Sequence, residues 1–520
     1  MNEHTFYSIL FELSEDRWGN DALKAPDFFG DLNIHQIVDG ITGGKEYEEY
    51  NLKPFFYAPL RRINGIKYRQ EIMQDLDDPS IFERSNVFSK QMRDMRKSLG
   101  ISQKTSYKGH KQSWFLEAVV IYCAAVDSFA NDLFNLDLKS RGFQSFRNYL
   151  KSYSNRADFI SLQSETKKLK AALEAIRYCI LLEDGGRFTI RKYESEPDYS
   201  VEINELFAKF RGNYVDNDET QLDDNGVESM NHIEAIMLDF VTRLHPEIFA
   251  SLDEYCAKNI SFMDETITTY DREIQFYIAY LNHIADLKEA KLQFCYPYIS
   301  DNSKEVFDYD GFDLALADKR IRYREGPIVV NSFHMNGEER ILVITGPNQG
   351  GKTTFARTFG QLHYLASLGC PVPGSKARLF LFDNLFTHFE REEKVENMRG
   401  KLEDDLVRIH HILSQATSRS IIIVNEIFTS TTLVDEISLS VKLMKKITQL
   451  EALCAWVTFI DELASFGPRT VSMVSTVDPQ NPAVRTFKIE RRPADGLAYA
   501  TAIAQKYNLT YEFIRKRMES

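Results

Sequence analysis

The sequence predicts an α + α/β protein, in which a long helical region is followed by an α/β domain with a mostly parallel sheet. The chain of 520 residues is long enough for two to four domains. Up to about residue 320 the apolar residues follow helical spacing, and after about residue 325 short apolar runs alternate with helical segments. We expect an N-terminal extension at 1–30, the helical region at 31–324 and the α/β domain at 325–520.

The composition narrows the class of protein. A chain with 43% hydrophobic and 27% charged residues, 25 Gly and 15 Pro is globular rather than disordered or fibrous. The 63 Lys and Arg against 76 Asp and Glu give a formal net charge of −13, which excludes a uniformly basic nucleic-acid-binding surface. Any contact with DNA or RNA must therefore come from a local basic patch.

The cysteines and the apolar runs predict a cytoplasmic protein without a membrane segment. Six cysteines are scattered without CxxC spacing, which argues against a disulfide framework or a zinc ribbon. The longest apolar run, 118–126, is about half of what a bilayer span needs. The acidic N-terminus lacks the basic and apolar parts of an export signal.

The clearest helical segment runs from about residue 263 to 294. Its apolar residues recur at steps of three and four, while charged residues take the opposite face. The apolar residues are Ile267, Tyr270, Ile274, Ile278, Leu281 and Ile284. A helix of this length spans roughly 45 Å, which is longer than a compact domain usually needs and predicts a lever or strut.

Charge is unevenly distributed within the helical region. The break at 212–226 predicts an exposed loop, and 212–242 holds eight acidic residues and no Lys or Arg, so nucleic acid is not expected there. By contrast, 84–112 has eight basic residues against one Asp, and 139–192 has twelve against five acids. The eight are Arg84, Lys90, Arg93, Arg96, Lys97, Lys104, Lys108 and Lys111. Both stretches are either solvated helix faces or a surface that contacts phosphates without reading base sequence.

Five apolar runs predict the strands of the α/β domain, at 341–345, 379–382, 421–424, 455–459 and 470–475. The first run is followed by a G-x-x-x-x-G-K-[ST] motif and then by a helical segment, which is the context that this motif requires. Its glycines let backbone N–H groups cradle phosphates at the positive end of a helix. The predicted binding residues are Gly346, Pro347, Asn348, Gln349, Gly350, Gly351, Lys352, Thr353 and Thr354.

Four side chains carry the predicted chemistry. Lys352 is expected to reach the β- and γ-phosphates of ATP, and the Thr353 hydroxyl to bind Mg²⁺. After the run 421–424 come Asn425 and Glu426, where Glu426 is placed to accept a proton from the attacking water. Asn425 can hold a Mg²⁺-bound water but brings no negative charge, so weaker metal binding and slower turnover are expected.

At these residues the chain resembles the MutS family of ABC-type ATPases. TGPNQGGKTT (345–354) is similar to that family's Walker A motif, and VNEIFTSTTLVDE (424–436) to its Walker B motif running into the D-loop. ILSQAT (412–417) and VTFIDEL (457–463) also match, the latter at the switch segment. Weaker likenesses cover 31–42 and 57–76, at the start of the family's helical lever domain, and 270–281, at the helix that returns to its ATPase domain.

The resemblance implies a helical lever and clamp region, an ABC-type ATPase, and ATP and Mg²⁺ as ligands. It also implies a homodimer, in which each nucleotide lies between one subunit's P-loop and its partner's signature and D-loop segments. In this chain the residues that cross to the partner would be Gly400 and Lys401 of the signature and Ser430, Thr431 and Asp435 of the D-loop.

The chain departs from the family at three positions of this composite site. Gly400 stands where the family has serine, and acids follow at 403–405. These acids either repel a γ-phosphate or stabilise the first turn of a helix. Phe459 stands where the family has the switch His, so no γ-phosphate hydrogen bond is expected there. Together with Asn425, these changes predict slow or regulated hydrolysis.

Two of the family's domains are not expected. Nothing before residue 31 could form its mismatch-binding domain, since Phe11-Glu12-Leu13 is too near the terminus to be the Phe-x-Glu wedge, and no endonuclease domain follows Ser520. Recognition of DNA by its shape, as at junctions, is the replacement hypothesis.

Three smaller candidates leave alternatives open. His410 and His411 face different directions on a helix, so a shared metal site is not expected. Phe333 either stacks on the base of the nucleotide or belongs to the core. The tail 493–499 and the helix 502–518 are either a dimer contact or a packed terminal hairpin.

We therefore expect an ATP-binding and ATP-hydrolysing dimer whose helical arms clamp duplex, mismatched or branched DNA in repair or recombination. The alternative is a nucleotide-gated scaffold that has lost efficient hydrolysis and holds a protein partner. The net charge of −13 and Asn425 favour this alternative, and the two basic stretches oppose it.

Overall fold

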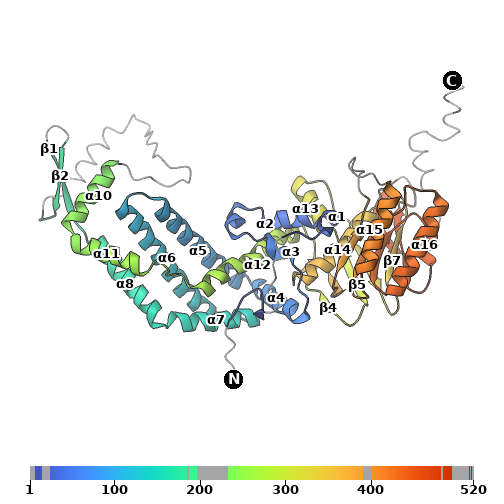
Figure 1. Cartoon of the computed structure of the whole chain (residues 1–520), viewed down its shortest axis with the longest axis horizontal. Coiled ribbons are helices and arrows are strands. Elements are labelled where there is room, and N and C mark those ends of the chain that lie inside the picture. Colours follow the sequence, from blue (N-terminus) through green and yellow to red (C-terminus); the bar gives the residue numbers. More distant parts are fainter. Residues whose placement is uncertain are drawn as a thin grey trace. The chain divides into compact units, whose positions relative to one another are not determined.

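The computed structural model describes residues 6–14, 24–183, 187–195, 232–390, 400–481 and 484–494, with Arg515 and Arg517. These residues group into two compact units (Figure 1). Unit 1 takes its described residues from 79–138 and 144–271, and unit 2 from 6–78, 139–143 and 272–520. The predicted loop at 212–226 and most of the predicted tail and helix after 494 lie outside the described residues.

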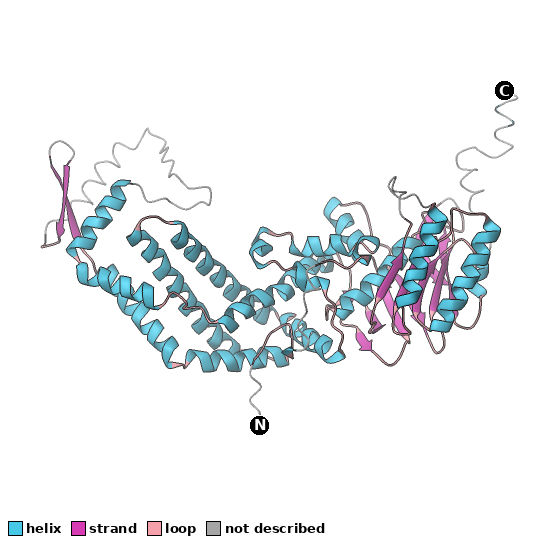
Figure 2. Ribbon diagram, in the orientation of Figure 1, coloured by secondary structure: helices cyan, strands magenta, loops and turns pink. Residues whose placement is uncertain are grey.

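Unit 1 consists almost entirely of helices (Figure 2). Its longest, α5 (Pro79–Lys104) and α6 (Lys108–Asn135), lie side by side and are joined by only a short turn, as expected of antiparallel neighbours. Its other elements are α7 (Arg141–Ser154) from residue 144 on, α8 (Ala157–Glu174), β1 (Tyr178–Glu183), β2 (Arg187–Lys192), α10 (His232–Leu244) and α11 (Pro246–Lys258).

Buried aromatic rings form much of the core of unit 1. Phe88 stacks on Phe129 with ring centroids 4.4 Å apart, and Phe146 stacks on Tyr270 at 3.5 Å. The two stacks join α5 to α6 and α7 to the start of α12, and an edge contact of Phe88 with Tyr270 at 6.0 Å links the two pairs. Trp114 on α6 is partly buried in the same unit.

The helix predicted at 263–294 is confirmed as α12 (Glu265–Glu289). Its predicted apolar face is buried, and Ile267, Ile274 and Ile284 have no exposed surface. The helix ends earlier than predicted, because the chain turns at Lys291, whose φ is 66°, and then enters a short strand. The first seven residues of α12 belong to unit 1 and the others to unit 2.

Helix α6 extends well beyond the apolar run 118–126 that the sequence singled out. Among the described helices it alone is long and apolar enough to cross a membrane, and half of its most apolar stretch is buried inside the structure. The core helix of a helical unit has the same length and composition, so this observation alone assigns no membrane contact.

The short strands of the helical region were not predicted. β1 and β2 form an antiparallel hairpin with Tyr178 opposite Lys192. The first strand is a continuous apolar run, YCILLE, and a run of this kind has no periodicity that separates a strand from a buried helix. β3 (Phe294–Cys295) and β8 (Val372–Pro373) form another two-stranded pair, in unit 2.

The main sheet of unit 2 has six strands, of which all but the last are parallel. In spatial order they are β10 (Leu385–His388), β11 (Ile421–Asn425), β12 (Leu453–Val457), β7 (Ile341–Thr345), β13 (Thr470–Val477) and β14 (Arg485–Arg491). Four of the five predicted strands lie here, as predicted for a mostly parallel sheet. Because parallel strands end at one edge, the segments after β7, β11 and β12 lie close together.

The run 379–382 was wrongly grouped with these strands. It overlaps β9 (Lys376–Phe380), which belongs to a separate four-stranded sheet with β4 (Tyr298–Ser300), β5 (Val306–Gly311) and β6 (Asn331–Met335). There β9 pairs in antiparallel register with β5. Both sheets bury this kind of run equally, so its apolar composition could not tell which sheet it joins.

Helices cover both faces of the main sheet (Figure 2). α15 (Lys401–Gln415) and α16 (Leu433–Leu450) share a hydrophobic core with one face, in which Met444 and Trp456 are fully buried. α14 (Lys352–Ser367) packs on the other face, where a Cβ on Gly360 would come within 2.6 Å of both Ile423 and Leu32. This glycine therefore permits close packing of helix and sheet.

Residues near the N-terminus also belong to unit 2. The Phe29 ring meets Tyr364 of α14 at 5.2 Å, and buried Arg69 donates to the carbonyl oxygens of Leu10 and Leu368. The remaining elements of this unit are α1 (Phe28–Asp31), α2 (Ile34–Thr42), η3 (Lys45–Tyr50), α3 (Lys53–Tyr57), α4 (Ile63–Leu76), α13 (Leu314–Tyr323) and η5 (Asp461–Ser465). No single cut along the sequence separates the two compact units, and the linear boundaries at 30 and 324 stay predictions.

Candidate nucleotide-binding site

The phosphate-binding motif forms the predicted strand–loop–helix arrangement. β7 ends at Thr345, α14 begins at Lys352, and the loop between them requires left-handed backbone conformations. Gly346 and Gly351 have φ of 116° and 91°, which glycine adopts at low cost, and Gln349 has φ of 59°. The glycines of the motif thus allow the chain to turn sharply from the strand into the helix.

Ser475, two residues before the end of β13, supports this loop and was not predicted to do so. Its hydroxyl donates a hydrogen bond of 2.7 Å to the carbonyl of Gly350. A Cβ on Gly350 would lie 2.3 Å from the Ser475 Oγ, so the contact is possible only with glycine there. The sequence held a usable signal, since the run 470–475 ends at Ser475 and neighbouring parallel strands end together.

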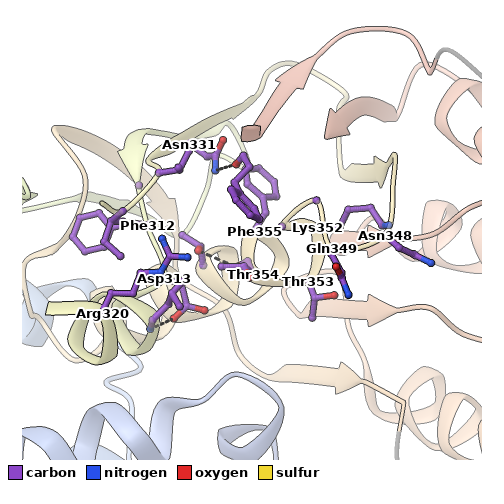
Figure 3. Close-up of a pocket in the computed structure, with 18 of the residues that line it drawn as sticks. Phe312, Asp313, Arg320, Asn331, Asn348, Gln349, Lys352, Thr353, Thr354 and Phe355 are labelled. Atoms are coloured by element: carbon purple, nitrogen blue, oxygen red, sulfur yellow. Dashed lines mark hydrogen bonds between the residues drawn. The ribbon is translucent and has the colours of Figure 1, made fainter. Parts of the chain in front are cut away.

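A cavity of about 340 Å³ opens beside the loop (Figure 3). All residues from Asn348 to Phe355 line it, together with Glu426. On the other side, Phe312 and Asp313 come from the turn before α13, and Arg320 comes from the last turn of that helix. The cavity therefore brings most of the predicted phosphate-binding residues together with a wall that the sequence did not predict.

The ammonium of Lys352 is held by its own loop. Its Nζ donates to the carbonyl oxygens of Gly346 at 2.9 Å and Pro347 at 3.1 Å, and it lies 4.1 Å from the centre of the Phe459 ring. Burial lowers the pKa of Lys352 to about 8, with nearby Glu426 raising it and Arg485 lowering it further. Gly346 and Pro347 thus act here through their carbonyls and do not line the cavity.

Thr353 and Asn425 meet as the sequence predicted for a pair that holds one cation. The Thr353 hydroxyl donates to the Asn425 Oδ1 at 2.9 Å, and Asn425 is almost completely buried at the end of β11. Hydroxyl and amide oxygens are ligands that Mg²⁺ accepts, so the donor set fits this ion. Because both ligands are neutral, they offer less electrostatic attraction than a carboxylate would.

Glu426 lines the cavity directly after β11. Its φ of 51° is uncommon for a residue with a side chain, and its N–H donates to the Val457 carbonyl at 3.0 Å. Burial raises the pKa of Glu426, while Lys352 lowers it and Glu390 raises it. A half-buried carboxyl with a raised pKa is suited to act as a general base toward a water in this cavity.

Similarity to known proteins agrees with this geometry. A model of MutS domain V matches residues 342–510. The DNA mismatch repair protein MutS of Chlorobium phaeovibrioides is 26% identical over 284 residues, which is 53% of this chain and 31% of that protein. The protein is MutS-like.

Other relatives match shorter parts of the chain. The MutS of Zymomonas mobilis is 32% identical over 142 residues, or 27% of this chain and 16% of that protein. The DNA mismatch repair protein MSH3 of Eremothecium gossypii is 30% identical over 138 residues, 26% of this chain and 13% of that protein. The chain thus matches less than a third of the length of each of these relatives.

Phe333 of this MutS-like protein is a core residue. It is buried on β6, and its ring packs against Phe355 at 6.2 Å and Phe359 at 5.2 Å. It does not line the cavity, so of the two readings the core aromatic is correct. The wall is built instead around Asp313, which caps α13 by accepting from the Leu316 N–H at 3.0 Å.

The helix predicted to carry the signature segment is α15, and Gly400 is its N-cap. Asp405 turns inward, where its Oδ1 lies 3.1 Å from the Nε2 of buried His388 on β10. Glu403 is exposed, and Lys401 pairs with Glu390. Asp405 is thus used inside the fold, and the acids are best explained as part of the helix.

The predicted D-loop leads into α16. Thr432 caps this helix by accepting from the Asp435 N–H at 3.3 Å, and its hydroxyl donates to the Asp435 carboxylate at 2.8 Å. Leu433 and Val434 expose 65% and 77% of their surface. Ser430, Thr431 and Asp435 do not line the cavity, and their contact with a partner stays a prediction. Among the described residues no group of three or more His, Cys, Asp or Glu side chains is placed to hold a metal ion, and the expectation for His410 and His411 stays a prediction.

Strand β14 supplies two residues that the sequence analysis missed. The Arg485 Nε donates to the Asn348 carbonyl of the phosphate loop at 3.2 Å. Phe487, with φ of 58°, lines the cavity, and its Cβ would lie 3.8 Å from a Cβ on Gly351. These contacts join residues more than 130 positions apart, and no local pattern in the sequence marks them.

Proposed function

We propose that the protein binds and hydrolyses ATP with Mg²⁺ at this cavity. The supporting observation is the meeting of Lys352, Thr353, Asn425 and Glu426 beside the phosphate loop, from separate parts of the chain. Loop N–H groups and the N-terminus of α14 attract phosphate, and Lys352 adds a positive charge. The match of residues 342–510 to MutS domain V supports this assignment.

Each side chain has one role in this proposal. Thr353 and Asn425 hold Mg²⁺, which supplies positive charge to the phosphates when bound. Glu426 accepts a proton from the attacking water. Because Asn425 is neutral and Phe459 cannot donate a hydrogen bond, we expect Mg²⁺ to bind weakly and turnover to be slow.

We further propose that two copies of the chain close on two nucleotides. The residues proposed to reach the partner are Gly400 and Lys401 at the start of α15, and Ser430, Thr431 and Asp435 before and in α16. Exposed Leu433 and Val434 beside the latter support a covered surface at this place. Closing and opening would then follow the nucleotide state.

The helical unit is proposed to grip duplex, mismatched or branched DNA in the cytoplasm. Support comes from three exposed lysines on α5, Lys90, Lys97 and Lys104, which recur every seven residues and so share one face of the helix. Other basic residues form ion pairs within the chain: Arg96 pairs with buried Asp271, and Arg156 pairs with Asp158 on the surface. The names of the relatives, DNA mismatch repair proteins, favour a role in repair or recombination.

A nucleotide-gated scaffold that holds a protein partner is the second candidate. The neutral Asn425 and the net charge of −13 favour it. In that case nucleotide binding would remain, while hydrolysis would be negligible and DNA would have no effect.

Steady-state ATP hydrolysis with and without duplex, hairpin and four-way-junction DNA separates the two. For the original chain we expect slow hydrolysis whose rate changes when DNA is added. Glu426→Gln should lose turnover by roughly 10²–10⁴-fold while it still binds ATP. The control Glu289→Gln on α12 should hydrolyse ATP at the original rate. If DNA neither binds in a salt-dependent manner nor alters hydrolysis, the scaffold is correct. If neither ATP nor ADP binds, the nucleotide site itself is refuted.

A further inference from the structure

The ammonium of Lys352 has a complete set of partners without any nucleotide. An ammonium group has three N–H bonds, and two of them are used by the carbonyls of Gly346 and Pro347. Phe459 presents its ring at 4.1 Å from the Nζ, within the range of a cation–π contact. The Lys352 side chain is buried, so its ammonium is shielded from bulk water, which strengthens a cation–π contact.

The backbone on both sides of Phe459 fixes the ring beside the phosphate loop. The Thr458 N–H donates to the carbonyl of Ile344, in the strand that leads into the loop, at 3.1 Å. The Ile460 N–H donates to the Thr458 hydroxyl at 3.1 Å, and the Ile460 side chain is buried. The ring itself remains 46% exposed, so it can be changed without removing a core residue.

We propose that Phe459 is a positioning residue that competes with the phosphates of the nucleotide for the ammonium of Lys352. This inference rests on the proposed nucleotide site and adds a determinant of its affinity. In the nucleotide-free protein the ring and two carbonyls hold the ammonium. Phosphate oxygens that bind the ammonium must draw it away from one or more of these three partners, so the ring favours the nucleotide-free state.

The chemistry of the ring makes the competition one-sided. Phenylalanine attracts a cation through its face but offers neither a donor nor an acceptor to a phosphate oxygen. Its contribution to the nucleotide-free state is therefore lost when the ammonium turns to phosphate. A side chain that could hydrogen-bond to phosphate at this position would contribute to the bound state as well.

Calorimetric titration of the full chain with Mg²⁺ and ADP, and separately with ATP, tests the competition. Phe459→Leu removes the ring but keeps an apolar side chain, and we expect it to bind ADP and ATP about two- to thirtyfold more tightly than the original chain. Phe459→Tyr keeps the ring face that attracts the ammonium, and we expect it to bind ADP and ATP less tightly than Phe459→Leu. If the ring had only a structural role, Phe459→Leu would bind nucleotide more weakly than the original chain, and the aromaticity of residue 459 would not determine the affinity.

Phe307→Leu is a matched control. Lys376 Nζ lies 6.0 Å from the centre of the Phe307 ring, so this variant removes another lysine–phenylalanine contact of the same unit that does not line the cavity. Its nucleotide affinity is expected to be unchanged. Equal or weaker binding by Phe459→Leu than by the original chain overturns the proposal.

A second measurement needs no nucleotide. Labelling of lysines with acetic anhydride, followed by mass spectrometry, is expected to modify Lys352 severalfold faster in Phe459→Leu than in the original chain or in Phe459→Tyr. Unchanged labelling would refute the ring–ammonium contact. If labelling changes but the original chain binds no nucleotide, the proposed function fails while the contact stands, so the two failures can be told apart.

Discussion

Residues of the candidate site meet because neighbouring parallel strands end at the same edge of the sheet. Lys352 and Thr353 follow β7, Asn425 and Glu426 lie at the end of β11, and Phe459 follows β12. Lys352 and Glu426 are electrostatically coupled, because each moves the pKa of the other toward its charged form. Burial opposes both charges, which makes this pair sensitive to what binds beside it.

Nucleotide affinity is expected to depend on pH through Lys352. Its pKa is about 8 in the free protein, and bound phosphates would raise it, because they stabilise the charged form. Affinity should therefore be full below pH of about 8 and fall as the pH rises above it, by at most about tenfold per pH unit. Titration calorimetry with ADP from pH of about 7 to about 9.5 measures this. Lys352→Ala should bind far more weakly at every pH, whereas Lys376→Ala should follow the original curve.

A carboxylate at position 425 is expected to strengthen the metal site. Asn425→Asp places a negative charge 2.9 Å from the Thr353 hydroxyl, where Mg²⁺ would be held. We expect half-saturation of hydrolysis at a lower Mg²⁺ concentration and a severalfold higher turnover. A magnesium titration of the ATPase rate gives both numbers. No gain in either would mean that the neighbours of Asn425 are adapted to an amide.

At the scale of elements, α-helices and strands near the site are held by specific polar contacts. Thr432 and Asp435 form a reciprocal cap on α16, and His388 lies against Asp405 of α15. Strand β5 carries the least expected group, since Asp308 is fully buried there. Its carboxyl occupies space left by Gly311 and Gly374, where an added Cβ would lie 1.9 Å and 2.5 Å from its oxygens.

Removing the charge of Asp308 is expected to stabilise unit 2. Burial raises the pKa of Asp308 to about 9, with a further contribution from Asp310 and an opposing one from the Gly311 N–H. Because the folded pKa lies above the unfolded one, the stability present at pH below about 4 is lost progressively as the pH rises toward 9. Asp308→Asn should thus raise the free energy of unfolding by on the order of a few kcal/mol at pH of about 8 and change it little near pH of about 4.

Denaturant unfolding at the two pH values checks this prediction. Asp286→Asn is a suitable control, because that residue is exposed on α12 and does not contribute to the pKa of Asp308. The gain in the free energy of unfolding of Asp308→Asn over the original chain should be larger at the higher pH than at the lower. An equal gain at both pH values would contradict the assignment of a neutral buried carboxyl.

At the scale of the whole molecule, chemistry and DNA binding are proposed for different units. The nucleotide site lies entirely in unit 2, whereas the lysines at 90, 97 and 104 lie in unit 1. Helix α12 has residues in both units, so the chain offers a continuous element by which one could affect the other. Substitutions in the two units can therefore be used to test nucleotide and DNA binding separately.

The lysines of α5 are expected to contribute to salt-dependent DNA binding. Replacing Lys90, Lys97 and Lys104 by Gln should weaken binding and reduce the slope of log affinity against log salt by up to about 0.9 for each phosphate that the variant no longer neutralises. Fluorescence anisotropy with labelled duplex and junction DNA at several salt concentrations measures this. The control variant Lys445→Gln with Lys446→Gln removes exposed lysine charges from α16 of unit 2, and it should leave the slope unchanged. An unchanged slope in the α5 variant would remove this face from the proposed DNA surface.

The sequence was sufficient to predict the phosphate loop and the central strands of unit 2, but not the elements at the edges of the candidate site. The phosphate loop, α12 and four strands of the main sheet were predicted, because each has a local signature in glycine spacing or apolar periodicity. Ser475, Arg485 and Phe487 were missed because they reach the site through strand pairing between distant segments. The 379–382 run was assigned to the wrong sheet and Phe333 was left undecided, since apolar composition does not reveal which neighbour covers a residue.

The placement of the tryptophans has a spectroscopic consequence. The chain has three, of which Trp114 lies in the helical unit, Trp456 is sealed in the central sheet, and Trp18 lies outside the described residues. A Trp18→Phe protein would carry one natural emitter per unit. Adding Trp114→Phe or Trp456→Phe to this variant leaves a single tryptophan in one unit. Its fluorescence during thermal unfolding would then report whether the two units unfold together or in succession, without any attached dye.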